Sequence, residues 1–397
     1  MIDQKSNRLD SVILFLGLLC LAVFVLLPLV FPDPNAISVA YLSKLRLAAG
    51  MFYGNPPSDI ATDIVGMRAL VKGIDPYQVL GPALEELGIH WDLNFQSPRL
   101  PMGFLFTAPV AFLPWAYAAP LWALLMIGCW ITSLRLLGLS WKLSIGIGGL
   151  LLFWPPAMFS LGQLTPIWLF MLCLAFALRE ERPSLAGAAI GIAAMTKYTP
   201  IVVLVNFARS KRMPKVLSST FIVSLAAIAG VFVLNPSAVA RFLAVNRTNY
   251  IGIFERLDNA APFAVWWRLG GWVGLLGWMA FLTLVIVANW RSVSSNTERG
   301  WMITFYLSVW LLPVLWIYSI LPLLPVVKYV MEKETTLSRV CALGGLALTF
   351  AGPAFGQPSV LFISGSVLLF GTALLISKIK WATEKSQPTR NLLHMES

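Results

Sequence analysis

The sequence alternates between long apolar stretches and short polar connections along most of its length. A helix needs about 20 apolar residues to cross the hydrocarbon core of a membrane, and Ser11–Phe31 is the clearest such stretch. Lys5 and Arg8 precede it, and Pro32 and Pro34 follow it. It is too long for the apolar core of a signal peptide. We therefore interpret it as an uncleaved anchor with a cytoplasmic N-terminus.

Further apolar segments follow a polar stretch and continue almost to the C-terminus. Together with the first helix they predict about twelve crossings. Several segments are short or contain proline, so we expect them to be buried among neighbouring helices. The stretch Pro101–Trp115 is predicted to be a re-entrant or interfacial helix. The predicted crossings are Tyr117–Leu137, Ser144–Ser160, Thr165–Leu178, Ser184–Thr196, Pro200–Ala208, Leu217–Leu234, Gly271–Trp290, Trp301–Ile317, Ser319–Val330, Val340–Gly352 and Val360–Ile376.

Composition supports the same class of protein. Of the 397 residues, 58% are hydrophobic and only 12% are charged, whereas soluble domains carry roughly 25% charged residues. Disorder is excluded as well, because it requires low hydrophobicity. The sequence predicts an all-α polytopic membrane protein with one transmembrane domain over residues 1–380 and a disordered cytoplasmic tail over residues 381–397.

The net charge of +11 would suggest a nucleic-acid partner in a soluble protein. In a membrane protein, Lys and Arg concentrate in cytoplasmic loops. With an N-terminus inside, the basic clusters all alternate onto the cytoplasmic side, so the charge is an orientation signal and no nucleic acid is expected. Two longer loops, residues 32–100 and 235–270, are then predicted to face outward. The basic clusters are Arg135/Lys142, Arg179/Arg182, Arg209/Lys211/Arg212/Lys215, Arg291/Arg299, Lys333/Arg339 and Lys378–Arg390.

Cysteine and histidine give no metal-binding pattern. The four cysteines each lie in an apolar run, which is typical of small core residues, and the two histidines are far apart in sequence. No spacing typical of a zinc site occurs. We expect no metal site and no cofactor, and the sequence leaves a metal requirement of the activity open.

The first outer loop is rich in acidic residues and contains a predicted amphipathic helix. Ser58 is a suitable N-cap for a helix that begins at Asp59, and Gly73 is a suitable end before a turn at Asp75-Pro76. Such a helix would lie on the outer face of the membrane. Its apolar stripe at helical spacing consists of Ile60, Ile64, Met67 and Val71.

Asp59 and Asp63 lie one turn apart on this helix, and two interpretations apply to them. In the first, Asp59 is a carboxylate at a helix start, where the helix dipole favours it, and Asp63 is solvated. In the second, one of them is a general base at the membrane surface that accepts a proton from a hydroxyl nucleophile.

This run resembles the first-loop signature of glycosyltransferase family 87, whose members are polytopic enzymes of the GT-C type. The family pattern has an early aspartate, then A/G-x-R-A-L-x-x-G, then D-P-Y; here these are Asp59, Gly66-Met-Arg68-Ala-Leu-Val-Lys-Gly73 and Asp75-Pro76-Tyr77. The resemblance implies a GT-C-like fold, with a long first outer loop that carries amphipathic interfacial helices. It places the catalytic aspartate at Asp59, with Asp63 as the alternative.

Three later segments resemble the family in the same order. They are Leu161-Gly162-Gln163-Leu-Thr165, the run from Leu185 to Pro200 with its Lys197, and Asp258-Asn259-Ala-Ala-Pro262. Lys197 has two interpretations: it snorkels to an interface or pairs with a carbonyl, or its ammonium binds the phosphate of a lipid donor. Gln163 and Asn259 are sugar ligands or helix-packing amides. The candidate substrate-binding residues are Arg68, Asp75, Tyr77, Arg99, Gln163, Lys197 and Asn259.

Two segments depart from the family pattern. The family's Y-P-P-L after the first loop is replaced here by Gln96-Ser97-Pro98-Arg99-Leu100-Pro101. The family's late W-x-H-Y stretch is replaced by Trp316-Ile-Tyr318-Ser319, which has no histidine. Any role of that histidine is therefore not carried over, and the substrate site is expected to differ from that of the mannosyl members.

The resemblance implies an integral-membrane glycosyltransferase. It would move a hexose, by analogy mannose, from a polyprenyl-phosphate-sugar donor to the hydroxyl of a lipid or glycan acceptor, with membrane lipids around it. We expect a multi-pass protein of the bacterial inner membrane whose active site faces the periplasm or outside. A transporter or flippase of lipid-linked saccharides is the alternative, but it should place ionisable residues near the midplane of many helices. A polymerase or ligase of lipid-linked glycans is a third possibility.

Overall fold

The computed structural model describes residues 2–31, 45–46, 48–53, 58–77, 80–85, 97, 99–245, 259–312, 314–351 and 359–386. Within these ranges the chain is helical, and no β-strand is present. The predicted all-α class is therefore confirmed. The fold follows from the sequence pattern, because in lipid the backbone polar groups of a spanning segment must be satisfied within a helix.

Four described helices are long and apolar enough to cross a membrane. They are α1 (Ile2–Val30), α7 (Trp115–Leu136), α12 (Met213–Leu234) and α14 (Pro262–Val293). Several shorter apolar helices accompany them, which agrees with a multi-pass membrane protein, whereas the total of about twelve crossings stays a prediction. The shorter ones include α8 (Trp141–Leu151), α10 (Thr165–Leu178), α11 (Pro183–Thr196), α17 (Thr336–Ala351) and the apolar part of α18 (Ser359–Ser386).

Several predicted crossings are interrupted. The segment predicted over Ser144–Ser160 divides into α8 and α9 (Pro155–Ser160), because two prolines occupy the first turn of α9. The segment predicted over Trp301–Ile317 forms α15 (Glu298–Trp310) and ends there. It is followed by the 3₁₀ helix η5 (Ile317–Leu323) and by α16 (Leu324–Lys333).

The short apolar stretches form short helices. Pro101–Trp115 contains α5 (Pro101–Phe104), η3 (Leu105–Thr107) and α6 (Ala108–Ala111), in place of one continuous re-entrant helix. The stretch predicted over Pro200–Ala208 is the 3₁₀ helix η4 (Thr199–Phe207). At the C-terminus, α18 continues to Ser386 and so extends into the segment for which the sequence predicts a tail.

A sharp kink divides α14 at Gly271, which has a φ of 54°. This left-handed conformation favours glycine, since a side chain would be strained there. The chain folds back so closely that a Cβ added to Gly274 would lie 1.9 Å from the carbonyl oxygen of Trp266. A short helix before Gly271 therefore lies against the start of the longer one, which begins where the crossing Gly271–Trp290 was predicted.

Helix α1 joins the rest of the chain through a close contact with α8. A Cβ on Gly17 would lie 2.1 Å from the carbonyl oxygen of Gly146, and one on Gly149 would lie 2.1 Å from that of Gly17. Small residues allow the two backbones to approach each other, as is common between helices in membranes.

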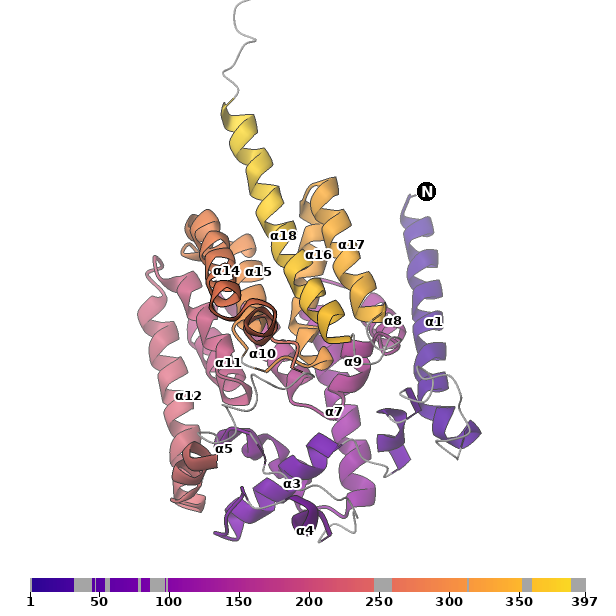
Figure 1. The fold of residues 1–397 in the computed structure, drawn as a ribbon. Helices are drawn as coiled ribbons and strands as arrows, with labels where there is room; N and C mark the ends of the chain where they lie inside the picture. Colours follow the sequence, from indigo (N-terminus) through magenta and orange to yellow (C-terminus); the bar gives the residue numbers. More distant parts are fainter. Residues whose placement is uncertain are drawn as a thin grey trace, which may run out of the picture.

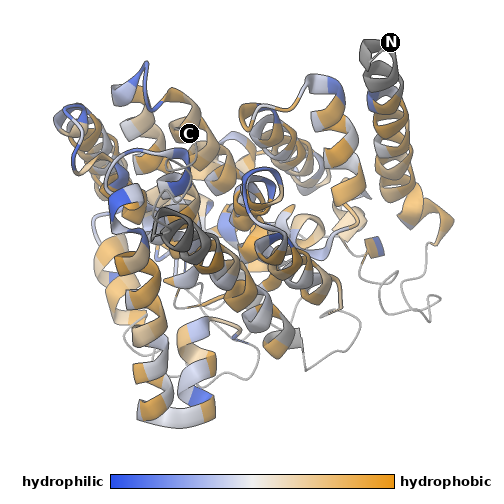
Figure 2. Cartoon of the chain, turned by 90° about the horizontal axis from the view of Figure 1, so that it is seen from above, coloured by the Kyte–Doolittle hydropathy of each residue, from blue (hydrophilic) through white to orange (hydrophobic). Residues whose placement is uncertain are grey.

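Hydrophobic side chains are exposed on the outer faces of α12 and α14, among them Phe221 and Trp272. This is expected for surfaces that face lipid. Figure 2 shows how widely hydrophobic residues cover the helices.

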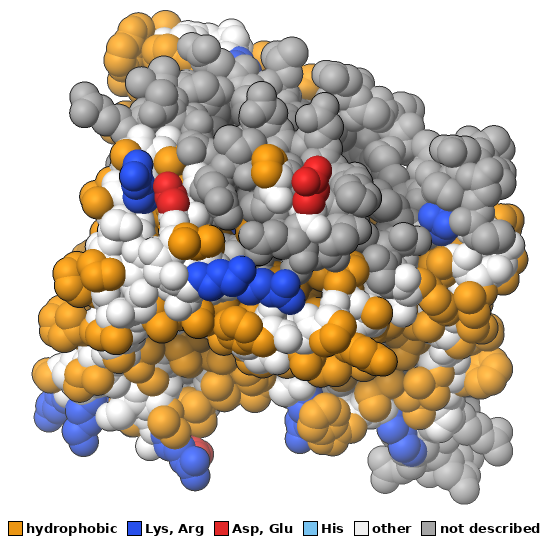
Figure 3. Space-filling model, turned by 90° about the horizontal axis from the view of Figure 1, so that it is seen from below, with side chains coloured by type: hydrophobic (Ala, Val, Ile, Leu, Met, Phe, Trp, Pro, Cys, Tyr) orange, Lys and Arg blue, Asp and Glu red, His pale blue; other side chains and the backbone are white. Residues whose placement is uncertain are grey.

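The two predicted outer loops meet at one end of the molecule. Helices α3 (Ser58–Val71), α4 (Leu80–Glu85) and α5 lie at this end, whereas α18 rises toward the end that carries the N-terminus (Figure 1). Asn235 Nδ2 donates a hydrogen bond of 2.7 Å to the carbonyl oxygen of Ile74 and so connects the two loops. Seen from this end, hydrophobic side chains cover much of the described surface, and separate groups of Lys and Arg lie among them (Figure 3).

Candidate active site

Helix α3 carries both acidic candidates and matches the predicted helix closely. It begins at Ser58, one residue before the predicted start, and the turn after it contains Gly73 with a φ of 69°. Its residues from Ile60 to Met67 are all buried. Gly66 allows close packing, since a Cβ there would lie 2.4 Å from the ring of Phe104 in α5. The helix therefore lies beneath neighbouring segments and has no solvated face over these residues.

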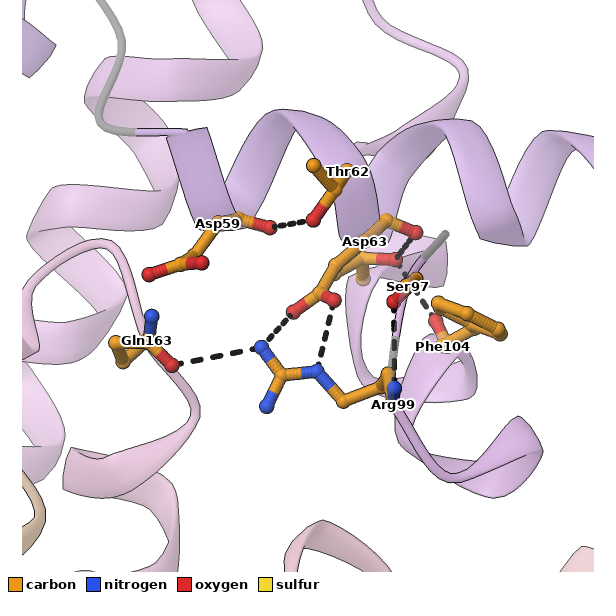
Figure 4. Close-up of polar contacts among 8 residues, drawn as sticks. Asp59, Thr62, Asp63, Ser97, Arg99, Phe104 and Gln163 are labelled. Atoms are coloured by element: carbon orange, nitrogen blue, oxygen red, sulfur yellow. Dashed lines mark hydrogen bonds and ion pairs between the residues drawn. The ribbon is translucent and has the colours of Figure 1, made fainter. Parts of the chain in front are cut away.

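Asp63 and Arg99 form a bidentate ion pair. Arg99 Nε donates to Asp63 Oδ1 at 2.8 Å, and Arg99 Nη2 lies 2.8 Å from Asp63 Oδ2 (Figure 4). The Asp63 side chain is only 1% exposed and that of Arg99 is 13% exposed. A paired guanidinium and carboxylate hold each other in one orientation. The interpretation of Asp63 as a solvated carboxylate is therefore wrong.

Burial dominates the proton affinity of Asp63. Removal from water raises the pKa of this carboxyl from 3.8 to about 6, although the charge and hydrogen bond of Arg99 lower it. Burial lowers the pKa of Arg99, but the Asp63 carboxylate opposes that effect, and its pKa stays above the ordinary value. The two residues thus depend on each other for charge balance inside the protein.

Arg99 is held from several sides. The hydroxyl of Tyr77 donates to the backbone oxygen of Arg99 at 2.9 Å, and the Arg99 amide donates to Ser97 Oγ at 3.3 Å. Arg99 Nη2 also lies 3.4 Å from Gln163 Oε1, which comes from the connection between α9 and α10 (Figure 4). Tyr77 is fully buried and its ring packs on Phe104. Arg99 therefore presents a fixed guanidinium, in which Nη1 makes no hydrogen bond to any described residue.

Asp59 has a different environment from Asp63. Its carboxylate makes no hydrogen bond or ion pair with a described side chain, and the residue is partly exposed. Its backbone oxygen accepts a bond of 2.8 Å from Thr62 Oγ1. Burial raises the pKa of Asp59, while the nearby charges of Arg99 and Lys197 lower it. The Asp59 carboxylate is thus close to two cations, Arg99 and Lys197, but forms an ion pair with neither.

Lys197 lies between α11 and η4 and points into the same site. Its Nζ donates to Ser319 Oγ at 3.0 Å and lies 5.6 Å from the ring centroid of Trp168 and 5.7 Å from that of Tyr318. Aromatic ring faces attract an ammonium group. Lys197 is therefore directed inward and does not snorkel to an interface.

Two other candidates, Arg68 and Asp75, hold segments together. Arg68 Nε and Nη2 donate to the carbonyl oxygens of Ala111 and Leu113, which lie at the end of α6. Asp75 Oδ1 accepts from the amide of Tyr77, and its Oδ2 lies 3.6 Å from Arg241 Nε.

Asn259 acts in a similar way at the second outer loop. It is fully buried, and its Oδ1 accepts hydrogen bonds from the amides of Ala261 and Leu315. It thereby joins the start of α14 to the segment after α15. Asp258, from the same motif, lies outside the described residues.

The structure also brings Trp168, Tyr318 and Ser319 into the site, and these were not among the candidates. Trp168 belongs to α10, whereas the other two belong to η5, which packs against α9 and α10. Their positions depend on tertiary packing. The sequence contains one signal for two of them: Tyr318 and Ser319 stand at the positions of histidine and tyrosine in the family's W-x-H-Y stretch. Among the described residues, no group of three or more histidine, cysteine or acidic side chains could hold a metal ion.

Comparison with known families agrees with this geometry. A sequence model of glycosyltransferase family 87 matches residues 101–315, more than half of the chain, and the chain therefore belongs to this family. The matched part contains Gln163, Lys197 and Asn259, whereas Asp59 and Arg99 precede it. No curated protein and no solved structure shows significant similarity to the chain. As a member of this family, the protein is a membrane glycosyltransferase.

Proposed function

We propose that the protein transfers a hexose, mannose by analogy with the family, from a polyprenyl-phosphate-sugar donor to a hydroxyl of a lipid or glycan acceptor. The observation that carries this proposal is the Asp59 carboxylate, which pairs with no side chain that the structure describes and lies near the cations Arg99 and Lys197. The reaction would take place at the end that carries α3. We place that end on the outer side of a bacterial inner membrane, because the basic loops favour the opposite end for the cytoplasm.

Asp59 would act as the general base. An acceptor hydroxyl loses its proton to the carboxylate while its oxygen forms a bond to the anomeric carbon of the donor. The bond from that carbon to the lipid phosphate breaks, and the phosphate leaves with the electron pair. A base must be unprotonated and within reach of the hydroxyl, and Asp59 is partly exposed and forms no ion pair with the side chains in the described ranges.

Arg99 and Lys197 would stabilise the leaving phosphate. Positive groups that are fixed in advance at developing negative charge lower the barrier most effectively. Asp63 would position Arg99, since it holds the guanidinium by two contacts of 2.8 Å. The hydrogen bond from Arg99 to Gln163 would place that amide at the edge of the sugar.

The alternative, a flippase of lipid-linked saccharides, receives less support. Such a protein should carry ionisable residues near the midplane of many helices. Here Asp59, Asp63, Arg99 and Lys197 gather near α3, at one end of the molecule. A charged site gathered beside α3 and membership of a glycosyltransferase family favour transfer over transport.

Transfer can be tested with the purified full-length protein in lipid nanodiscs. Radiolabelled polyprenyl-phosphate mannose, the matching glucose donor and a nucleotide sugar would be supplied with a panel of lipid and glycan acceptors. We expect labelled product from a polyprenyl-phosphate donor and none from the nucleotide sugar. Movement of the labelled donor across proteoliposomes without any labelled product would contradict the proposal and support a flippase.

A further inference from the structure

Tyr318 lies beside the candidate catalytic residues although it is distant from them in sequence. It stands near the start of η5, and its ring centroid is 5.7 Å from Lys197 Nζ. Its neighbour Ser319 accepts the hydrogen bond from Lys197, which fixes this end of η5 against the lysine. Asp59 and Arg99 both act on the Tyr318 hydroxyl electrostatically. The phenol therefore lies beside Lys197 and within the electrostatic influence of the proposed base.

One polar atom beside Tyr318, Gln163 Nε2, lacks a well-formed hydrogen bond among the described residues. The Tyr318 side chain lies next to the Gln163 amide and is partly exposed. Gln163 is only 3% exposed, and its Nε2 makes no hydrogen bond of good geometry among the described residues. In Figure 4 this nitrogen points toward the side on which the Asp59 carboxylate lies. Buried polar atoms are almost always paired, so a Gln163 Nε2 without a well-formed hydrogen bond among the described residues, beside a partly exposed phenol, leaves room for a polar ligand.

We propose that Tyr318 contacts the transferred sugar and determines which sugar is accepted. The apolar face of the ring packs on the C–H face of the pyranose, and the hydroxyl, together with Gln163 Nε2, hydrogen-bonds one sugar hydroxyl. This proposal rests on the proposed function, because it assumes that a sugar occupies the space beside Asp59.

The chemistry of tyrosine suits this task. Its ring supplies apolar contact area at a low cost in conformational entropy, and its hydroxyl supplies one directed polar contact. A site built to hydrogen-bond a hydroxyl discriminates strongly against an analogue that lacks it, because the polar groups of the site are then left unpaired. Lys197 does not replace this function, since an ammonium beside Ser319 is suited to the phosphate and not to one particular sugar hydroxyl.

The test pairs deletion of the hydroxyl on the protein with deletion of hydroxyls on the ligand. Dissociation constants in nanodiscs would be measured for polyprenyl-phosphate mannose and for analogues that each lack one sugar hydroxyl. The proteins compared are the wild type, Tyr318→Phe, Tyr318→His and the control Tyr306→Phe. Tyr306 is a fully buried tyrosine in α15, outside the site, and its hydroxyl has no hydrogen-bond partner among the described residues.

We expect the wild type to bind one analogue about tenfold more weakly than the parent donor, in line with the loss of one hydrogen bond. Tyr318→Phe should lose this preference, Tyr318→His should change which analogue is bound least well, and Tyr306→Phe should match the wild type. Unchanged preferences in both Tyr318 variants would overturn the proposal.

Binding is measured here without turnover, so this result is independent of whether transfer occurs. Failure of transfer in the nanodisc assay would refute the proposed function, whereas unchanged sugar preferences would refute only the role of Tyr318. With an active preparation, kinetics add a second criterion. Tyr318→Phe should raise KM for the parent donor more than it lowers kcat, because the lost contact is made in the bound donor before reaction.

Discussion

Asp63 binds Arg99 through two contacts of 2.8 Å, while Asp59, one helical turn earlier, pairs with no described side chain. Two carboxylates on one helix thus have different environments. Asp63 holds a cation in place, and Asp59 remains available to a ligand. This difference favours Asp59 over Asp63 as the proposed base, a distinction that spacing along the sequence does not make.

Replacement of Arg99 by glutamine should destabilise the protein. Asp63 would remain buried without its counter-charge, and breaking such a pair costs about 3–5 kcal/mol. Thermal unfolding in one detergent at neutral pH measures the effect. The double variant Asp63→Asn/Arg99→Gln replaces the pair by neutral groups of similar shape, so it should recover most of the stability but not the activity. A double variant as unstable as Arg99→Gln would contradict this account.

The stability should also depend on pH through Asp63. Its pKa in the folded chain, about 6, lies above the ordinary value of 3.8, so the folded state binds this proton more tightly than the unfolded state does. The stabilisation that the protonated Asp63 carboxyl gives the folded state is fully present below pH 3.8, the ordinary pKa, and is lost as the pH rises through about 6. Since Arg99 lowers this pKa, Arg99→Gln should extend the loss to higher pH. Unfolding midpoints across the pH range, with Asp63→Asn/Arg99→Gln as the reference, measure this shift.

The pH dependence of transfer should report Asp59. A general base works only when it is unprotonated, so kcat/KM should rise with pH as Asp59 loses its proton. Burial raises the pKa of Asp59, which places the acidic limb above the pH expected for an ordinary aspartate. Lys197 lowers that pKa, so Lys197→Met should move the limb to higher pH. Lys211→Met, an exposed lysine outside the site, should leave it in place.

Tyr77 should act through Arg99. Removal of its hydroxyl in Tyr77→Phe deletes the hydrogen bond to the Arg99 backbone oxygen but keeps the packing of the ring. We expect a loss of about 1 kcal/mol in stability. We also expect a lower kcat with an unchanged acidic limb, because Asp59 itself is untouched. Tyr117→Phe, whose side chain is 66% exposed, is the matched control; an equal effect in both variants would exclude a positioning role.

The contact between α1 and α8 should tolerate no added methyl group. In Gly17→Ala the new Cβ would lie 2.1 Å from the carbonyl oxygen of Gly146, and relief of such a clash costs about 1–3 kcal/mol. Gly128→Ala is the control, since nothing lies within 4 Å of its Cβ and alanine favours a helix by up to about 1 kcal/mol. Unfolding midpoints should therefore move in opposite directions.

Hydropathy predicted the helices where each is continuous and apolar. Thr165–Leu178 was predicted with the bounds that α10 has, and α11 differs by one residue. The prediction failed where a crossing is interrupted, as between α8 and α9, because apolar composition continues through the break. The end of α15 at Trp310 is a similar case, since the sequence remains apolar beyond it.

The site was predictable only in part. The candidates Asp59, Asp63, Arg99, Gln163 and Lys197 do come together. Motif resemblance identified all of them except Arg99, which was a candidate only as a cation of the first outer loop, in a segment that departs from the family pattern. Hydrogen bonding within loops explains the positions of Arg68, Asp75 and Asn259, which spacing cannot distinguish from ligand binding. Tyr318 was missed, since its position beside Lys197 depends on how η5 packs against α9 and α10.

The most direct measurement of the central claim is the transfer rate of Asp59→Asn in nanodiscs, at saturating donor and acceptor. Asparagine keeps the shape of the side chain but cannot accept the proton. We predict that kcat falls by about 10²–10⁴-fold, the usual contribution of a general base, while donor binding changes little. Asp75→Asn, in the same loop, should retain most activity. A transfer rate of Asp59→Asn equal to that of the wild type would contradict the assignment of Asp59 as the base.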